Sequence, residues 1–277
     1  MPFQKIFLLL LFIPLFSFKK SAAQSDSLPP ENWDVYMAKY EKGAGSVLLN
    51  LSLKPAVPVK GYGFIIITGV TFSDCSAEGF PSNRAFTTLY KISDSVKAVI
   101  DRYTASIIAG TFTYQCERLD YIYVKDTTWI REKLLKLYAI RFPGYKPYIN
   151  IKEDQNWDGY LKFLYPNEET LDYMGNQKVI MALQRAGDKL DKARTIDHWA
   201  YFKSDADRIC FITYLTKNRF KVTAKENTGS TALPYKIQFS RMDKPDLGSI
   251  TKITLALRKQ AGKCQGEYDG WETVVIK

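Results

Sequence analysis

Apolar residues in the first half of the chain form short runs separated by glycine and proline, a pattern typical of β-strands. The first three runs predict a meander, the next two a hairpin, and the last two closing strands. The predicted strands cover residues 33–41, 46–53, 64–72, 107–115, 119–124, 148–151 and 160–164. Apolar spacings of three and four predict two helices between them, one capped by Ser82 and one that starts near Thr127 and ends before Pro143. This half is expected to be a sheet covered by helices on one face.

The second half alternates helical and strand patterns. Its helices are expected to begin at the capping residues Asn176, Ser204 and Asp246. Its strands are expected at residues 198–202, 220–224, 235–241 and 267–276. The resulting order contains the split βαβ pattern of the ferredoxin-like fold. The expected fold class is therefore α+β, with two α/β-sandwich domains, each a mostly antiparallel sheet with helices on one face, the second ferredoxin-like.

The chain begins with a targeting pattern. Lys5, an apolar run over residues 6–18 and the small residues 21–23 have the layout of a secretory signal peptide, and the run is too short to span a bilayer. A second boundary is a polar, turn-rich stretch between the halves. We expect an exported protein, periplasmic or secreted, with no membrane span in the mature chain. Its predicted parts are a signal peptide at 1–24, a first domain at 31–167, a linker at 168–175 and a second domain at 176–277.

The net charge of +10 belongs to the second half of the mature chain. Residues 25–174 hold 17 basic and 18 acidic side chains, a net charge of −1, whereas residues 175–277 hold 19 and 11, a net charge of +8. Lys217, Arg219 and Lys221 cluster around a predicted strand. An RNA-binding sheet would also show exposed aromatic residues in a recognisable pattern, which is missing here. The cluster therefore favours a solvated basic face, or a docking surface for an acidic protein partner, over a nucleic-acid site.

The four cysteines divide evenly between the halves, with Cys75 and Cys116 in the first and Cys210 and Cys264 in the second. An exported protein with an even number of cysteines can form disulfides, and one pair in each half is the simplest of the three pairings. The alternative is four buried or free thiols. No CxxC pair occurs, so a zinc site has no support.

Catalytic patterns are scarce. The sequence has a single histidine and contains no GxGxxG, GxxxxGK[ST] or GxSxG motif. That histidine lies in the sequence Asp197-His198-Trp199, where it could act as a base. We favour a structural role, in which Asp197 and His198 close a turn and Trp199 packs against the core. An enzyme with a site between the halves, built from Asp197/His198 or Glu117/Arg118, is the alternative; no cofactor or metal site is expected.

Two stretches of the second half carry a family resemblance. Residues 267–273, EYDGWET, and residues 194–202, RTIDHWAYF, resemble motifs of the ribonuclease E inhibitor B family, also called regulator of ribonuclease activity B (RraB). The resemblance implies a ferredoxin-like domain that binds a protein and is not an enzyme. Tyr268, Asp269, Gly270 and Trp271 are then motif residues, with Asp269-Gly270 suited to a tight turn or a bulge and Trp271 to a core position. Glu272 stands where the family motif has glycine, and the typical family member is acidic and cytoplasmic.

The first half, over roughly residues 31–167, resembles the domain of unknown function 695 family (DUF695). The matching pieces, in family order, are residues 33–36, 46–53, 78–81, 109–113, 118–121, 157–160 and 164–166. That family implies architecture and no activity. The combined expectation is an exported regulatory protein that binds a protein partner. The alternatives are the enzyme described above and a nucleic-acid-binding domain in the basic half.

Overall fold

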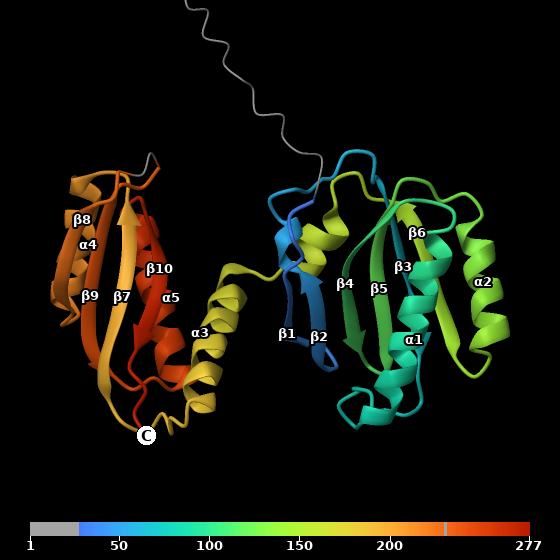
Figure 1. Cartoon of the computed structure of the whole chain (residues 1–277), viewed down its shortest axis with the longest axis horizontal. Helices are drawn as coiled ribbons and strands as arrows, with labels where there is room; N and C mark the ends of the chain where they lie inside the picture. Colours follow the sequence, from blue (N-terminus) through green and yellow to red (C-terminus); the bar gives the residue numbers. More distant parts are fainter. Residues whose placement is uncertain (1–27, 230–231) are drawn as a thin grey trace, which may run out of the picture.

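The computed structural model describes residues 28–229 and 232–277 (Figure 1). The expected signal peptide lies outside the described residues. Among the residues that are described, no helix is long and apolar enough to cross a membrane. The described residues form two antiparallel sheets with helices, which confirms the α+β fold class.

The first sheet has six strands, all antiparallel to their neighbours, in the order β1-β2-β4-β5-β3-β6. They are β1 Trp33–Tyr40, β2 Gly43–Asn50, β3 Phe64–Thr71, β4 Ser106–Tyr114, β5 Glu117–Val124 and β6 Lys146–Glu153, and a 3₁₀ turn η1, Leu51–Leu53, follows β2. The expected β4–β5 hairpin is confirmed. The expected three-stranded meander is wrong, because β2 pairs with β4 and β3 lies between β5 and β6. Strand β3 is apolar on both faces, which suits an interior position in the sheet.

Each face of this sheet has its own core. Helices α1, Asn83–Ile100, and α2, Ile130–Arg141, cover one face and bury side chains such as Leu89 and Leu134. The opposite face is covered by η2, a π-helical segment over Gly159–Leu164, together with the buried Trp157. Residues 160–164 were expected to form a strand, and that prediction is wrong. Their apolar side chains pack onto the face of the sheet and do not extend its edge.

Asp154 and Trp157 explain how η2 is positioned. The Asp154 carboxylate accepts hydrogen bonds from Tyr123 Oη at 2.6 Å and from the backbone N–H groups of Asp158 and Gly159, both at 2.8 Å. The Trp157 ring is fully buried and stacks on the Tyr123 ring, with centroids 3.7 Å apart and planes 1° apart. The segment η2 is thus fixed to the sheet by one carboxylate and one aromatic stack.

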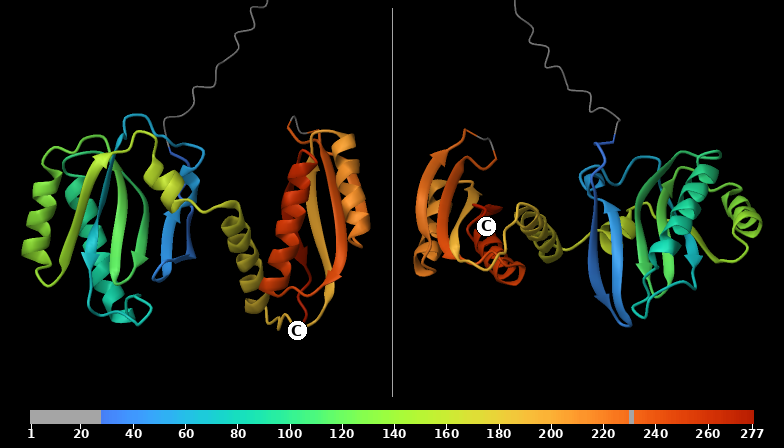
Figure 2. Two further views of the ribbon diagram at one scale, coloured as in Figure 1. Left: turned by 180° about the vertical axis from the view of Figure 1, so that it is seen from behind. Right: turned by 60° about the horizontal axis from the view of Figure 1, so that its bottom comes forward.

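The second sheet has four strands in the order β10-β7-β9-β8. They are β7 Arg194–Phe202, β8 Lys221–Asn227, β9 Tyr235–Asp243 and β10 Gly266–Thr273, with α4 Asp205–Lys217 and α5 Leu247–Lys263 as the connecting helices. This is the strand order of a ferredoxin-like β-α-β-β-α-β unit, as expected. Both helices lie on one face of this sheet, and none of the helices in the described residues covers the other face (Figures 1 and 2).

Helix α3, Glu168–Arg185, joins the two sheets along the chain. Its N-cap is Asn167, whose side chain accepts a hydrogen bond from the backbone N–H of Thr170 at 2.8 Å. We expected a polar linker at 168–175 and a helix start at Asn176. In the structure those residues are the first two turns of α3. Asn167 followed by two acidic residues is a normal helix start, because a capping oxygen and negative charge both stabilise the exposed N–H groups there.

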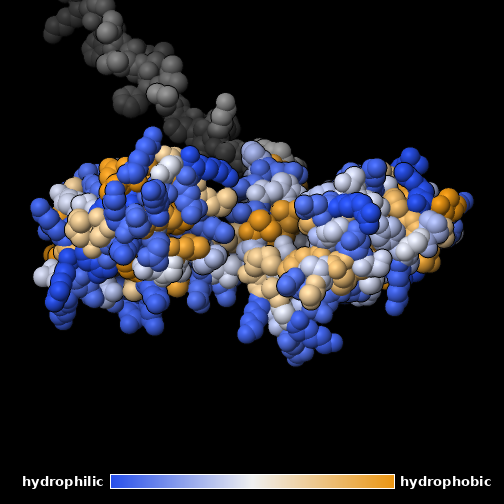
Figure 3. Space-filling model, turned by 90° about the horizontal axis from the view of Figure 1, so that it is seen from below, coloured by the Kyte–Doolittle hydropathy of each residue, from blue (hydrophilic) through white to orange (hydrophobic). Residues whose placement is uncertain are grey.

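The surface seen from below is mostly hydrophilic, with apolar residues in small groups between charged side chains (Figure 3). Large apolar side chains that are exposed occur in both parts of the chain, among them Met37, Ile140 and Met242. Candidate binding surfaces must therefore be sought in local combinations of shape and charge.

Candidate functional site

A pocket of about 270 Å³ lies where α3, α5 and β10 meet, and the family-like motif of β10 forms one of its walls. Its lining residues are Leu171, Asp172, Gly175, Asn176, Val179, Arg258, Tyr268, Asp269, Gly270 and Trp271. We call this the motif pocket. Four consecutive motif residues therefore meet α5, which directly precedes β10, and α3, which is distant from it in sequence.

A β-bulge explains the spacing of the motif. The register between β10 and β7 shifts between Tyr268 and Gly270, so Asp269 is an extra residue. The side chains of two residues three positions apart on a regular strand point to opposite faces of the sheet. One extra residue between them, as in a bulge, brings both side chains to the same face. Tyr268 and Trp271 are accordingly both buried on the helix-covered face. Gly270 has a φ of +156°, a conformation that L side chains rarely adopt, so the bulge requires glycine there.

Inside the pocket, one asparagine links the motif to both helices. Trp271 Nε1 donates to Asn176 Oδ1 at 2.7 Å, and Asn176 Nδ2 donates to Thr254 Oγ1 at 2.8 Å and to Asp172 Oδ2 at 3.1 Å. The Thr254 hydroxyl also donates to Asp172. All four side chains are buried, so each hydrogen bond replaces one that water would otherwise supply.

Arg258 completes this network from the solvent side. Its Nε lies 3.1 Å and its Nη2 3.0 Å from Asp172 Oδ1, and its Nη1 donates to the backbone carbonyl of Tyr268 at 3.2 Å. Both carboxylate oxygens of Asp172 therefore have donors, from Arg258 on one side and from Thr254 and Asn176 on the other. A carboxyl group with this many donors has a structural role and has no lone pair directed at a substrate.

His198 lies behind the pocket in the core. Its ring is fully buried, its Nδ1 is 2.9 Å from Tyr268 Oη, and it stacks on Phe239 with centroids 5.3 Å apart. Burial, together with the nearby positive charge of Arg241, lowers the pKa of His198 to about 3. Burial also raises the pKa of the Tyr268 phenol well above its usual value. Both groups are neutral near pH 7, and the pair acts as packed, hydrogen-bonded core.

The neighbours of His198 face the other way. Strand β7 begins at Arg194, and its even-numbered residues are buried under the helices. Asp197 and Trp199 are partly exposed on the opposite face, which no helix covers. We call this the open face; it carries Thr195, Asp197, Trp199 and Tyr201 of β7, Lys236, Gln238 and Met242 of β9, and Glu267, Gly270 and Glu272 of β10. The expectation that Asp197 and His198 close a turn and that Trp199 packs in the core is wrong.

The basic residues singled out from the sequence lie at one edge of the second sheet. Lys217 ends α4, Arg219 occupies the loop with a φ of 62°, and Lys221 begins the edge strand β8, all three exposed. Lys221 is in register with Ser240, which is in register with Asp197, so the three residues form one row across the sheet. We call Lys217, Arg219 and Lys221 the basic corner.

The residue pairs considered for catalysis do not form a site. Asp197 and His198 lie on opposite faces of their sheet. Glu117 and Arg118 belong to β5 of the first sheet, where Arg118 is buried with its guanidinium 4.9 Å above the Tyr90 ring. Within residues 28–229 and 232–277, no group of three or more histidine, cysteine, aspartate or glutamate side chains is arranged to hold a metal ion.

The cysteines form one disulfide in each half. Cys75 is bonded to Cys116, at the loop before α1 and the β4–β5 turn, and Cys210 of α4 is bonded to Cys264 at the end of α5. The second bond fastens together the two helices that cover the four-stranded sheet.

Sequence reasoning did not find Asp172, Asn176 and Thr254 as members of a site. The available signal was the spacing of Asp172 and Asn176, four residues apart and therefore on one face of a helix. The polar, turn-rich composition of residues 168–175 predicts a linker there and so hides that signal. Nothing in the sequence marks Thr254 as a member of a site, because threonine is common in amphipathic helices.

Each half of the chain matches the model of a known protein family. Residues 31–165 match the model of a family of unknown function, DUF695, and residues 174–273 match the model of Regulator of ribonuclease activity B. Both resemblances expected from the sequence are thereby confirmed. No curated protein matches the chain in a sequence comparison. Among solved structures, the chain is similar to "an Unknown Protein from Galdieria sulphuraria", with 11% identity, coverage of 77% of this chain and 99% of that one, and a TM-score of 0.22.

Proposed function

We propose that this protein is an exported, non-catalytic regulator whose second domain acts by binding an acidic protein partner. The premise is the match of residues 174–273 to a family of regulators of ribonuclease activity. The observation that carries the proposal is the hydrogen bonding of the polar side chains inside the motif pocket. Its buried carboxylate, amide and hydroxyl groups are hydrogen-bonded to one another, so the motif supports the fold and leaves no activated nucleophile or base.

The open face and the basic corner together form the docking surface in this proposal. The face offers the partly exposed aromatic rings of Trp199 and Tyr201, a residue type common at the centre of interfaces. Lys221 extends the same face toward the basic corner, about 10 Å from Asp197 across two strand spacings. Exposed cations at a rim attract an acidic partner and speed association.

Export has separate support. The sequence layout of residues 1–24 favours secretion. Two disulfides, one in each half, suit an oxidising compartment, because cytosolic thiols are kept reduced. An exported regulator would not meet a cytoplasmic ribonuclease, so the partner in this proposal is a protein outside the cytoplasm.

The test combines location with crosslinking. Host cells are fractionated to find the compartment that holds the mature protein. In a second experiment, a photo-crosslinking amino acid replaces Tyr201 on the open face or Thr213 on the exposed side of α4. We expect the mature protein in the exported fraction and a discrete crosslinked product from position 201 alone. A cytoplasmic location, or equal crosslinking from both positions, would refute the proposal.

A charge-reversal comparison identifies the contact. The triple variant Lys217→Glu, Arg219→Glu, Lys221→Glu is expected to lose the crosslinked product. The matched triple variant Lys252→Glu, Lys259→Glu, Lys263→Glu makes the same change in net charge on exposed residues of α5. It is expected to keep the product. Equal loss in both variants would show that only the overall charge matters.

A further inference from the structure

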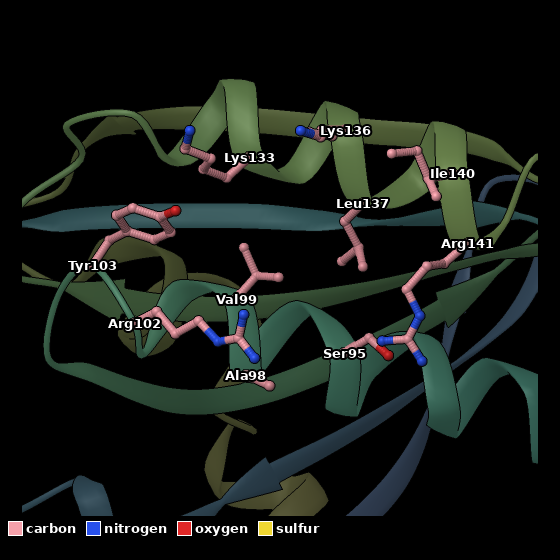
Figure 4. Close-up of a pocket in the computed structure, with 10 residues that line it drawn as sticks. All are labelled: Ser95, Ala98, Val99, Arg102, Tyr103, Lys133, Lys136, Leu137, Ile140 and Arg141. Carbon is pink, nitrogen blue, oxygen red and sulfur yellow. The ribbon is translucent and has the colours of Figure 1, made fainter.

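A groove of about 280 Å³ lies between α1 and α2 in the first domain (Figure 4). It is lined by Ser95, Ala98, Val99, Arg102, Tyr103, Lys133, Lys136, Leu137, Ile140 and Arg141. We call it the helix groove. Neither the resemblance of this half to a family of unknown function nor the function proposed above gives it a role.

The helix groove is positively charged although the first half of the mature chain is nearly neutral. Four of its ten lining residues are cations, namely Arg102, Lys133, Lys136 and Arg141, and none is acidic. Lys133 lies 3.4 Å from the carboxylate of the exposed Glu132. Arg102, Lys136 and Arg141 make no ion pair with any residue that the structure describes. Unpaired cations gathered around one concavity mark a site for negative charge.

The floor of the groove is apolar. Val99 and Leu137 lie between the two helices, and Leu137 is buried. Two larger apolar side chains are left exposed at the rim, Ile140 at 66% and Tyr103 at 46%. The groove thus has an apolar centre with cations around it, and its occupant must combine apolar and acidic groups.

The positions of the cations decide between a small amphiphile and a polypeptide. Arg102 and Lys133 lie at one end of the groove beside Tyr103, and Arg141 lies at the other end. From Lys133 to Arg141, α2 advances eight residues, which is about 12 Å. A single-headed amphiphile would neutralise one end only. A helical segment with carboxylates two turns apart would neutralise both ends and place apolar side chains on the floor between them.

We infer that the helix groove binds an acidic, amphipathic segment of a protein partner. The segment lies along the groove, its apolar side chains contact Val99, Leu137 and Ile140, and its acidic side chains meet the cations at both ends. This site is separate from the docking surface of the second domain, so each can fail without the other.

The experiment selects peptides on the intact chain. A display library of random 16-residue peptides is enriched on the full-length mature protein, and the affinities of enriched peptides are measured by fluorescence anisotropy. We expect enriched sequences with acidic residues seven or eight positions apart and apolar residues between them. The double variant Lys136→Glu, Arg141→Glu is expected to bind them at least tenfold more weakly.

The control variant keeps the charge change but leaves the groove intact. Lys91→Glu combined with Lys152→Glu alters two exposed lysines of the same domain that do not line the groove. It should bind within twofold of the unmodified protein, and circular dichroism should show all variants folded. The inference is overturned if no peptide is enriched, if the enriched peptides lack the acidic spacing, or if both variants weaken binding equally. Dodecanoate binding without peptide enrichment would show that a small amphiphile is the occupant instead.

Discussion

At the scale of single residues, His198 shows how the surroundings of a side chain decide its chemistry. A lone histidine next to an aspartate suggests a catalytic base. The alternation of β7 places the two on opposite faces, and the ring is enclosed by aromatic side chains. Its lowered pKa makes it a poor base near neutral pH but a sensitive reporter of folding.

The pH dependence of stability should follow this histidine. Burial lowers the pKa of His198 to about 3, so between that pH and about 6.5 the unfolded chain binds a proton that the folded chain does not. The contribution of neutral His198 is complete above pH 6.5 and is lost as the pH falls toward 3. We expect the free energy of unfolding to drop by about 2 kcal/mol between pH 7.5 and 5. Urea unfolding at several pH values measures it.

The controls use two substitutions. His198→Phe should flatten the dependence between pH 7.5 and 5, because the chain has no other histidine. Burial raises the pKa of Asp120, and a raised carboxyl pKa has the opposite sign, stabilising the folded state as the pH falls. Repeating the measurement with Asp120→Asn removes that contribution. An unchanged slope in His198→Phe would contradict the assignment.

Asn176 is a second residue whose side chain should contribute measurably to stability. In Asn176→Ala, Trp271 Nε1 and the Asp172 carboxylate each lose a partner while still buried. We expect the free energy of unfolding to fall by about 2–4 kcal/mol. Asn227→Ala, at an exposed position of β8, removes only an exposed acceptor for the Gly229 N–H and should lower it by less than about 1 kcal/mol. Equal effects would mean that the network of the motif pocket contributes little.

The residue pattern predicts Trp271 as a core side chain and Asp269-Gly270 as a tight turn or a bulge; Trp271 is buried, and of the two alternatives the structure has the bulge. It could not predict which helix meets them. The partners Asp172, Asn176 and Arg258 are 10 to 99 residues away from the motif in sequence, and only the tertiary fold selects them. Polar networks of this kind are long-range properties that no local pattern encodes.

At the scale of elements, local patterns found most strands and helices but not their order. The register of β4 with β5 follows from a short turn. The insertion of β3 between β5 and β6 depends on long-range pairing, and no turn dictates it. The π-helical segment η2 was missed because its apolar residues resemble a short buried strand, an ambiguity that periodicity alone cannot resolve.

Asp154 should control the folding of η2. Asp154→Ala removes the acceptor for Tyr123 Oη and for two backbone N–H groups. We expect it to lower the free energy of unfolding by about 2–4 kcal/mol and to reduce the near-ultraviolet dichroism of the Trp157–Tyr123 stack. The neighbouring Asp158→Ala removes only an exposed ion pair with Lys162 and should cost less than about 1 kcal/mol. A comparable loss in both variants would rule out the special role of Asp154.

At the scale of the whole molecule, the two disulfides should each stabilise their own half. They close segments with sequence separations of 41 and 54 residues. Loop-closure entropy predicts about 4 kcal/mol for each bond. Peptide mapping without reduction should recover Cys75 with Cys116 and Cys210 with Cys264, and Cys210→Ala with Cys264→Ala should lower the thermal midpoint. Any peptide that links the two halves would contradict this pairing.

The charge distribution of the whole chain also has a structural explanation. The net charge of +8 in the second half is spread over exposed lysines of several elements, and Arg258 is engaged by Asp172 in the motif pocket. In the nearly neutral first half, by contrast, four cations converge on one groove. Net charge by domain therefore did not indicate the cations of the helix groove, although it did indicate the half that holds the basic corner.

Helix α3 has a final consequence for how such proteins can be recombined in evolution or in the laboratory. Its Met174 packs in the core of the first domain, and Lys178 Nζ lies 2.5 Å from the Asp34 carboxylate of β1. The same helix supplies Asp172 and Asn176 to the second domain. The match to the regulator family begins at residue 174, so a gene fusion cut there would omit Asp172 and leave Arg258 without its carboxylate. The module that must be inherited as one piece is longer than the matched range of residues 174–273, and a transferable second domain begins at the cap of α3, Asn167.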